Sequence, residues 1–214
     1  MPMIQKFRPR SSCLIVAGIL AAQAGCNIFL PIIFLGEHKK SLPAEFDKLT
    51  GKRMAVLVWA DPATLFDYPH VRLELASYSA DKIRVGVEKC DVVDPYHVED
   101  FLDRNPEATV DPRKVGEQFE ADLVVYVELL EFQIRDAVAP DLCRGRIRAT
   151  VAVHDLRAEA DEINRYTLAP VEVIYPENHP VLMSSRNAQI VRRNAYEQFS
   201  EKLARKFFEH QVEL

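Results

Sequence analysis

The sequence predicts an α/β (α+β) fold: a single mixed-sheet domain behind an N-terminal lipoprotein signal or membrane anchor. Two observations support this prediction. Short apolar runs of strand length alternate with helical patterns, and the run at residues 123–130 is apolar enough for a central strand. Residues 146–154 instead alternate between apolar and polar side chains, as in a strand with one exposed face. The predicted order of elements is β-α-β-α-α-β-β-β-α.

The first half of the domain is expected to contain two strands and three helices. Residues 53–60 form a buried first strand, and a helix begins near Pro69 because proline fits the first turn. Residues 90–93 form a short second strand. Two Asp-Pro pairs, beginning at Asp94 and Asp111, then each start a helix. The aspartate accepts unpaired backbone N–H groups, while the proline has no N–H to lose.

The second half is expected to contain three strands and a long C-terminal helix. A loop at residues 137–145 joins the strand at 123–130 to the alternating strand, and residues 164–175 form a further extended segment. The last helix is capped near Ser184 or Ser185. Its inward-facing residues are Val191, Ala195, Phe199, Leu203 and Phe207. Its polar side is basic and includes Arg192, which favours a solvated face, with docking of an acidic partner as the alternative.

The N-terminal segment predicts an export signal that ends in a lipid anchor. Its basic residues are Lys6, Arg8 and Arg10. An apolar stretch follows at residues 14–22, and the small residues Ala24 and Gly25 precede Cys26. This arrangement resembles bacterial lipoproteins, in which the cysteine becomes acylated. Cys26 is therefore the predicted lipid attachment site.

An uncleaved transmembrane helix over residues 13–35 is the alternative to a cleaved signal, and a buried core helix is a further one. Gln23 stands where lipoproteins usually have leucine, and the chain stays apolar after Cys26. With either anchor, the basic N-terminus stays in the cytoplasm and the domain lies outside it, on the periplasmic face of the inner or outer membrane. The expected organisation is a signal or anchor at 1–36, a polar linker at 37–50 and an α/β envelope domain at 51–214.

Composition limits the partners and the chemistry of the domain. Removal of the N-terminal signal leaves 24 basic and 32 acidic residues, and so acidic a domain is a poor nucleic-acid binder. The 6 histidines form no metal motif, no cofactor-binding motif occurs, and no catalytic residue is predicted. Two of the 4 cysteines, Cys90 and Cys143, fall in the domain. They pair as a disulfide if they lie close together, or stay as two buried free thiols.

Two segments of the domain are candidate binding sites. Asp61 follows the first strand, at the end where open α/β sheets bind ligands, although an Asp-Pro turn explains it as well. The extended segment near Pro170 offers strand addition to a partner if it lies at a sheet edge, with core packing as the alternative. The candidate partner-binding residues there are Tyr166, Val171, Val173 and Tyr175.

Four segments together resemble the curli-secretion lipoprotein (CsgG-type) superfamily. They are residues 51–57, 90–94, 115–127 and 148–155, and the sharpest points are Gly116 and Asp122. That superfamily includes the LpoB-like activators of penicillin-binding proteins and resembles the amino-terminal domain of TolB. The resemblance implies an envelope lipoprotein domain that binds other proteins and has no enzymatic activity. Curli-type channels need two long membrane-inserting hairpins, whereas the loops around Pro140 and Pro170 are short, so a non-pore member is expected.

The predicted function is that of a membrane-anchored extracytoplasmic protein-binding module, an accessory lipoprotein in envelope assembly, secretion or peptidoglycan synthesis. One alternative is a secreted small-molecule-binding or hydrolytic α/β domain that uses Asp61. Another is a subunit of a ring-shaped export complex. The expected partners are the membrane, other envelope proteins and, for a ring, further copies of the chain.

Overall fold

The computed structural model describes residues 39–157 and 164–213, and these residues form a mixed α/β fold, as predicted. The predicted signal segment, with Cys26, lies outside the described residues. Residues 42–210 make the main compact unit. The described residues of a second unit lie at the two ends of the chain, where β1 (Lys39–Leu42) and β8 (His210–Glu213) form a two-stranded sheet.

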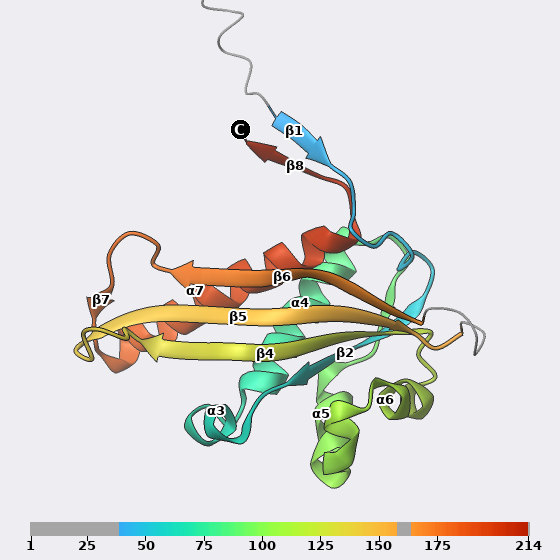
Figure 1. The fold of residues 1–214 in the computed structure, drawn as a ribbon, viewed down its shortest axis with the longest axis horizontal. Helices are drawn as coiled ribbons and strands as arrows, with labels where there is room; N and C mark the ends of the chain where they lie inside the picture. The colour runs from blue at the N-terminus through green and yellow to red at the C-terminus, as the bar shows by residue number, and fades with distance from the viewer. Residues whose placement is uncertain (1–38, 158–163, 214) are drawn as a thin grey trace, which may run out of the picture. The chain divides into compact units, whose positions relative to one another are not determined.

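The main unit is built on a sheet with the strand order β3-β2-β4-β5-β6 (Figure 1). These strands are β2 (Arg53–Trp59), β3 (Asp91–Val92), β4 (Leu123–Arg135), β5 (Leu142–Asp155) and β6 (Arg165–Tyr175). β2 is parallel to its neighbours β3 and β4, the latter being the middle strand, whereas β5 is antiparallel to β4 and to β6. A short strand, β7 (Val181–Leu182), pairs with the start of β5.

The predicted alternation along β5 is confirmed. Its inward-facing side chains are at most 1% exposed and belong to Ile147, Ala149, Val151 and Val153. β4 is longer than expected, because a register shift between Leu129 and Glu131 restores the inward alternation, which then continues through Phe132 and Ile134. The loop between β4 and β5 is therefore shorter than residues 137–145.

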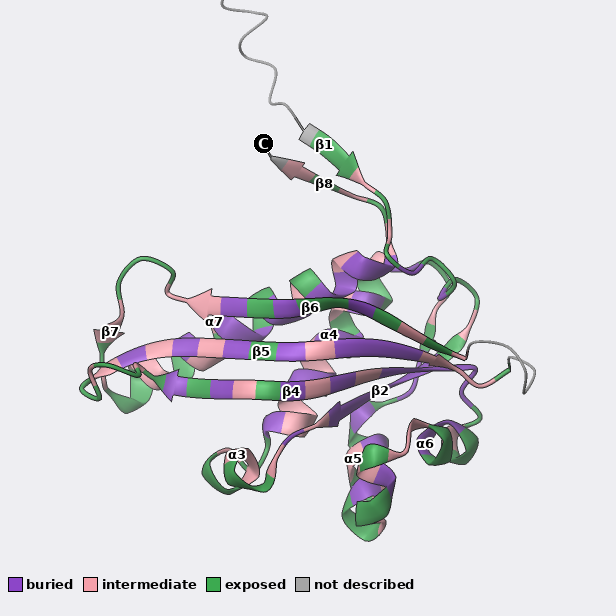
Figure 2. Ribbon diagram, in the orientation of Figure 1, coloured by how far each residue is buried: buried purple, intermediate pink, exposed green. Residues whose placement is uncertain are grey.

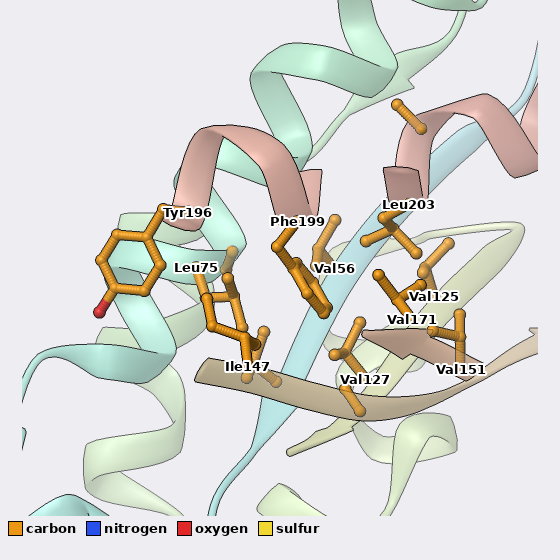
Figure 3. Close-up of a cluster of buried hydrophobic side chains, with 14 of the residues drawn as sticks. Val56, Leu75, Val125, Val127, Ile147, Val151, Val171, Tyr196, Phe199 and Leu203 are labelled. Carbon is orange, nitrogen blue, oxygen red and sulfur yellow. The ribbon is translucent and has the colours of Figure 1, made fainter. Parts of the chain in front are cut away.

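Helices cover the two faces of the sheet unequally. α4 (Val71–Gly86) and α7 (Ser185–Ala204) pack on one face, where side chains from both helices and all the long strands form the main core (Figure 3). On the other face, a smaller core lies over β2 and the start of β4. It is covered by α5 (Pro95–Arg104), the short 3-10 helix η1 (Pro106–Val110) and α6 (Pro112–Phe119). The remaining outer face of β4, β5 and β6 carries exposed and half-buried residues (Figure 2).

Three predicted helix starts are confirmed by their caps, whereas the helix predicted near Pro69 begins at Val71, with His70 as its uncapped N-cap residue and Pro69 outside the first turn. Asp94 accepts the N–H of Tyr96 at 2.9 Å, Asp111 that of Arg113 at 3.1 Å, and Ser184 that of Asn187 at 3.1 Å. The same chemistry makes one helix that was not expected, α3 (Pro62–Asp67). Asp61 and Pro62 are a third Asp-Pro pair, and this pair starts a helix instead of a simple turn.

Part of the expected linker belongs to the folded unit. Phe46 is 5% exposed and Leu49 is fully buried in the main core. The N–H groups of Glu45 and Phe46 both donate to the carbonyl of Lys206, which follows α7 in a second short 3-10 helix, η2 (Arg205–Phe207). The packed part of the chain therefore begins at Leu42 and not at Gly51.

A buried carboxylate joins the ends of three strands. One oxygen of Asp122, a residue only 5% exposed, accepts the N–H of Arg53 at 2.9 Å, and the other is ion-paired with Arg157. The backbone adds two further bonds, from Asp122 N–H to the Arg53 carbonyl and from Leu156 N–H to the Asp122 carbonyl. Arg53 also donates to the Phe119 carbonyl at the end of α6 and pairs with Asp91 at the start of β3.

We expect Asp122→Asn to destabilise the domain by about 2 kcal/mol, because the amide removes a buried charged acceptor from the Arg53 N–H and ends the ion pair with Arg157. Asp81→Asn is the matched control, since Asp81 makes only an exposed surface pair with Arg84. Its effect should stay below about 0.5 kcal/mol. Urea denaturation followed by circular dichroism measures both, and equal midpoints for the two variants would contradict the role given to Asp122.

Candidate functional site

A groove of about 570 Å³ opens where the end of α3, the end of β4 and the first turns of α7 converge. Its lining residues are Asp67, Tyr68, Ile134, Arg135, Met183, Ala188, Gln189 and Arg192. This volume lies within the range that ligand and peptide pockets occupy in proteins.

The floor of the groove is formed by an irregular end of β4. A register shift between Gln133 and Arg135 leaves Ile134 without a partner residue in β5. The N–H of Ile134 donates instead to the hydroxyl of Tyr68 at 3.4 Å. The ring of Tyr68 meets Phe132 edge-on at 4.7 Å, which ties the α3–α4 connection to the sheet.

Beneath Arg192 lie two buried polar atoms that have no well-formed hydrogen bond to any third described residue and interact with each other. They are the Tyr196 hydroxyl and Glu74 Oε2, and Arg192 Nε is 3.8 Å from the latter, too far for a hydrogen bond. Burial and the neighbouring Glu74 carboxylate raise the pKa of Tyr196, so this phenol stays protonated. Figure 3 shows the Tyr196 hydroxyl directed away from the apolar cluster.

Large apolar side chains are exposed beside this groove. Phe66 is 86% exposed, Leu182 72% and Ile190 37%, and each is the chain neighbour of a lining residue. Val138, in the loop between β4 and β5, is 92% exposed. We call Phe66, Leu182 and Ile190 the apolar rim. Exposed large apolar side chains next to a cavity are typical of surfaces that bind other molecules.

The groove is also charged unevenly. Arg135 is exposed, and no acidic side chain of the described residues forms an ion pair with it. Arg192 has only the 3.8 Å approach to Glu74, so its guanidinium keeps free donors. Asp67 is the one acidic lining residue. Within an acidic domain, the groove thus offers two arginines for a single carboxylate.

The candidate partner-binding residues lie on β6, which is an edge strand of the sheet. Their side chains, however, serve the core. Val171 and Val173 are 2% and 1% exposed, Tyr166 packs against the core, and the Tyr175 hydroxyl accepts a hydrogen bond from Asn194. Of the two alternatives left by the sequence, core packing holds for these side chains, and only the backbone of β6 is at an edge. Binding of a partner by strand addition stays a prediction.

The centre of the β6 edge is already occupied by the protein's own side chains. The N–H of Ala169 donates to Glu45 Oε2 at 2.9 Å, and Lys202 Nζ donates to the carbonyl of Glu172 at 2.8 Å. Between these points the register with β5 shifts at Pro170, which has no N–H to offer. Bulges, prolines and capped groups are devices that hinder edge-to-edge pairing.

Asp61 acts as the cap of α3. Its carboxylate accepts the N–H groups of Ala63 and Thr64 and the hydroxyl of Thr64, the last at 2.5 Å. The Thr64 hydroxyl is the main reason why the pKa of Asp61 is lowered. A cavity of about 340 Å³ lies nearby at the carboxyl end of β2, but Asp61 is not among its lining residues. Arg72, which does line it, is held by Glu99 and Asp103.

The disulfide considered from the sequence is absent from the structure, in which Cys90 and Cys143 are both free. Cys90 precedes the edge strand β3, whereas Cys143 lies three strands away in β5. Three strand spacings are about 14 Å, twice the Cα separation that a disulfide tolerates. Cys143 is fully buried and its thiol donates to Met183 Sδ at 3.1 Å.

The described residues contain neither a candidate metal site nor a candidate membrane-spanning helix. Among residues 39–157 and 164–213, no His, Cys, Asp and Glu side chains gather in a set able to hold a metal ion. Over the same residues, the chain forms no helix with the length and apolar character that a membrane crossing requires. The lipid attachment site Cys26 lies outside this part of the chain.

No known family model and no curated protein matches the chain. Among solved structures, the PelC dodecamer from Paraburkholderia phytofirmans is similar over 79% of this chain and 98% of its own, with 10% identity and a TM-score of 0.42. Lipoprotein GNA1162 from Neisseria meningitidis matches 68% of this chain and 95% of its own at 17% identity, with a TM-score of 0.36. A minor lipoprotein from Acinetobacter baumannii matches 78% and 99% at 13% identity, with a TM-score of 0.29.

Two of these three solved structures are thus bacterial lipoproteins. At such identities and TM-scores, the likeness assigns neither a family nor an activity to this chain. The similarity to the CsgG-type superfamily remains a resemblance of sequence pattern.

We predict that Cys90 reacts slowly with iodoacetamide at pH 8, because burial raises its pKa to about 11 and leaves little of the thiolate. Its rate should rise about tenfold per pH unit between pH 8 and pH 10. Buried Cys143 is the internal control and should stay unmodified until the protein unfolds. Peptide mapping under non-reducing conditions measures both thiols, and a peptide linking Cys90 to Cys143 would refute the assignment as free.

Proposed function

We propose that this protein is a membrane-anchored extracytoplasmic protein-binding module. It would serve as an accessory lipoprotein in envelope assembly, secretion or peptidoglycan synthesis, and not as an enzyme. Support comes from the export pattern that ends at Cys26 and from the surface of the domain behind it.

One observation supports this function more than any other: the apolar rim beside the groove. Phe66, Leu182 and Ile190 come from three different elements, α3, β7 and α7, and each adjoins in sequence a residue that lines the groove. Exposed apolar side chains are costly to keep in water and favour aggregation, so their presence next to a groove favours burial against another protein.

Site-specific crosslinking in intact cells tests this binding. A photo-crosslinking amino acid at Leu182 should give discrete adducts with one or a few envelope proteins. The matched control is Val85, which is 88% exposed but lies near the end of α4, away from the groove residues. Adducts of the same pattern and yield from both positions would argue against a specific binding surface.

The anchor is tested by the intact mass of the membrane-extracted protein. We expect a chain that begins at Cys26 and carries acyl groups, and we expect Cys26→Ser to remove them and stop cleavage. Cys13→Ser is the matched control, because Cys13 lies in the same segment but not at the predicted cleavage site. An unmodified chain that starts at or near Met1 would instead establish the transmembrane alternative.

A further inference from the structure

We infer that the groove binds an apolar peptide segment of an envelope protein, in which an acidic side chain stands beside the hydrophobic anchor residues. This inference rests on the proposed function and adds to it the chemistry of the partner. The groove, its two arginines and the apolar rim each set one requirement that the bound ligand must meet.

The shape of the site requires an apolar anchor. Tyr68, Ile134, Met183 and Ala188 provide apolar surface inside the groove, and its volume of about 570 Å³ accommodates side chains of the size of Leu or Phe. Met183 is unbranched, so it adapts to the shape of what it contacts. Apolar anchors that enter a pocket contribute most of the affinity in protein interfaces.

The extent of the exposed surface requires a polymer and not a small molecule. The apolar rim lies outside the cavity, on chain neighbours of Asp67, Met183 and Gln189. A ligand confined to the groove leaves that rim in water. A peptide that continues beyond the groove can contact rim residues next to the lining as well, which removes more apolar surface from solvent.

The charges require an acidic residue in the peptide. Arg135 has no ion pair within the described residues, and Arg192 has none shorter than its 3.8 Å approach to Glu74. A carboxylate bound in the groove that both residues line gains a charge-assisted hydrogen bond from a guanidinium group. Asp67 belongs to α3, whereas the two arginines come from β4 and α7. The acidic side chain of the peptide is therefore directed away from α3 and toward the β4 and α7 side of the groove.

The competing surface for a peptide is the edge of β6. Its centre is held by Glu45 and Lys202 and is interrupted at Pro170, so a partner strand must displace native contacts there. The groove needs no displacement of hydrogen bonds, because Arg135 and the apolar rim are exposed and Arg192 is half-buried with only its 3.8 Å approach to Glu74.

Peptide display against the detergent-solubilised full chain tests the inference. Random 12-residue libraries should yield peptides with Asp or Glu within about two positions of Leu, Ile or Phe, and their binding should weaken with added salt. We expect Arg135→Glu, and separately Phe66→Ser, to weaken the enriched peptides by about tenfold or more. Arg113→Glu is the matched control, an exposed arginine on α6, and should change binding by less than about twofold.

The outcomes separate this inference from the proposed function. Peptides that lack acidic residues, or that bind wild type and the Arg135 variant equally, overturn the groove assignment but leave a protein-binding module. Adducts from Leu182 without any enriched peptide also overturn the peptide-groove inference. Absence of both enriched peptides and Leu182 adducts contradicts the inference and the proposed function together.

Discussion

The carboxylate of Asp122 fixes the register between β2 and β4, and the rest of the domain depends on that register. It binds the first N–H of β2, and the neighbouring backbone groups of Arg53 and Leu156 close the same end of the sheet. β2 is buried on both faces, with Met54 toward α4 and α7 and Ala55 toward α5 and α6. A slip by one residue exchanges the two faces. Since both faces are apolar, hydrophobicity alone discriminates poorly between the two registers, and a polar contact is needed.

The unequal covering of the sheet determines which surfaces are available to partners. α7 approaches β5 closely because Gly145 has no side chain, and a Cβ there would lie 3.0 Å from that of Ala195. On the opposite face, the second core ends near Tyr126 and Leu156, so β5 and β6 expose polar side chains to water. Arg146 and Arg148 both approach Glu131 on that face. These two arginines of the exposed sheet face thus each have a carboxylate partner, whereas Arg135 in the groove has none among the described residues.

Most helices and strands could be predicted from the sequence, because strong local patterns mark where they begin and which face they bury. Asp-Pro caps and the period of two in β5 gave the helix starts and the strand correctly. α3 was missed although Asp61 and Pro62 repeat the same signal, and the length of β4 depends on bulges that no local pattern encodes. The groove was not predictable, because it joins residues far apart in sequence. Only Arg192 had been noted, as part of a basic helix face with an acidic partner as the alternative.

The 20-residue length of α7 sets a distance between anchoring and binding. Leu42, where the folded unit begins, lines a cleft with Lys202 and Lys206 at the carboxyl end of this helix. Ala188 and Arg192, in the groove, stand in its first turns. At 1.5 Å per residue, the stretch of α7 from Ala188 to Lys202 rises about 21 Å. In a lipid-anchored protein, α7 would then be a rigid spacer between the point where the tether enters and the groove.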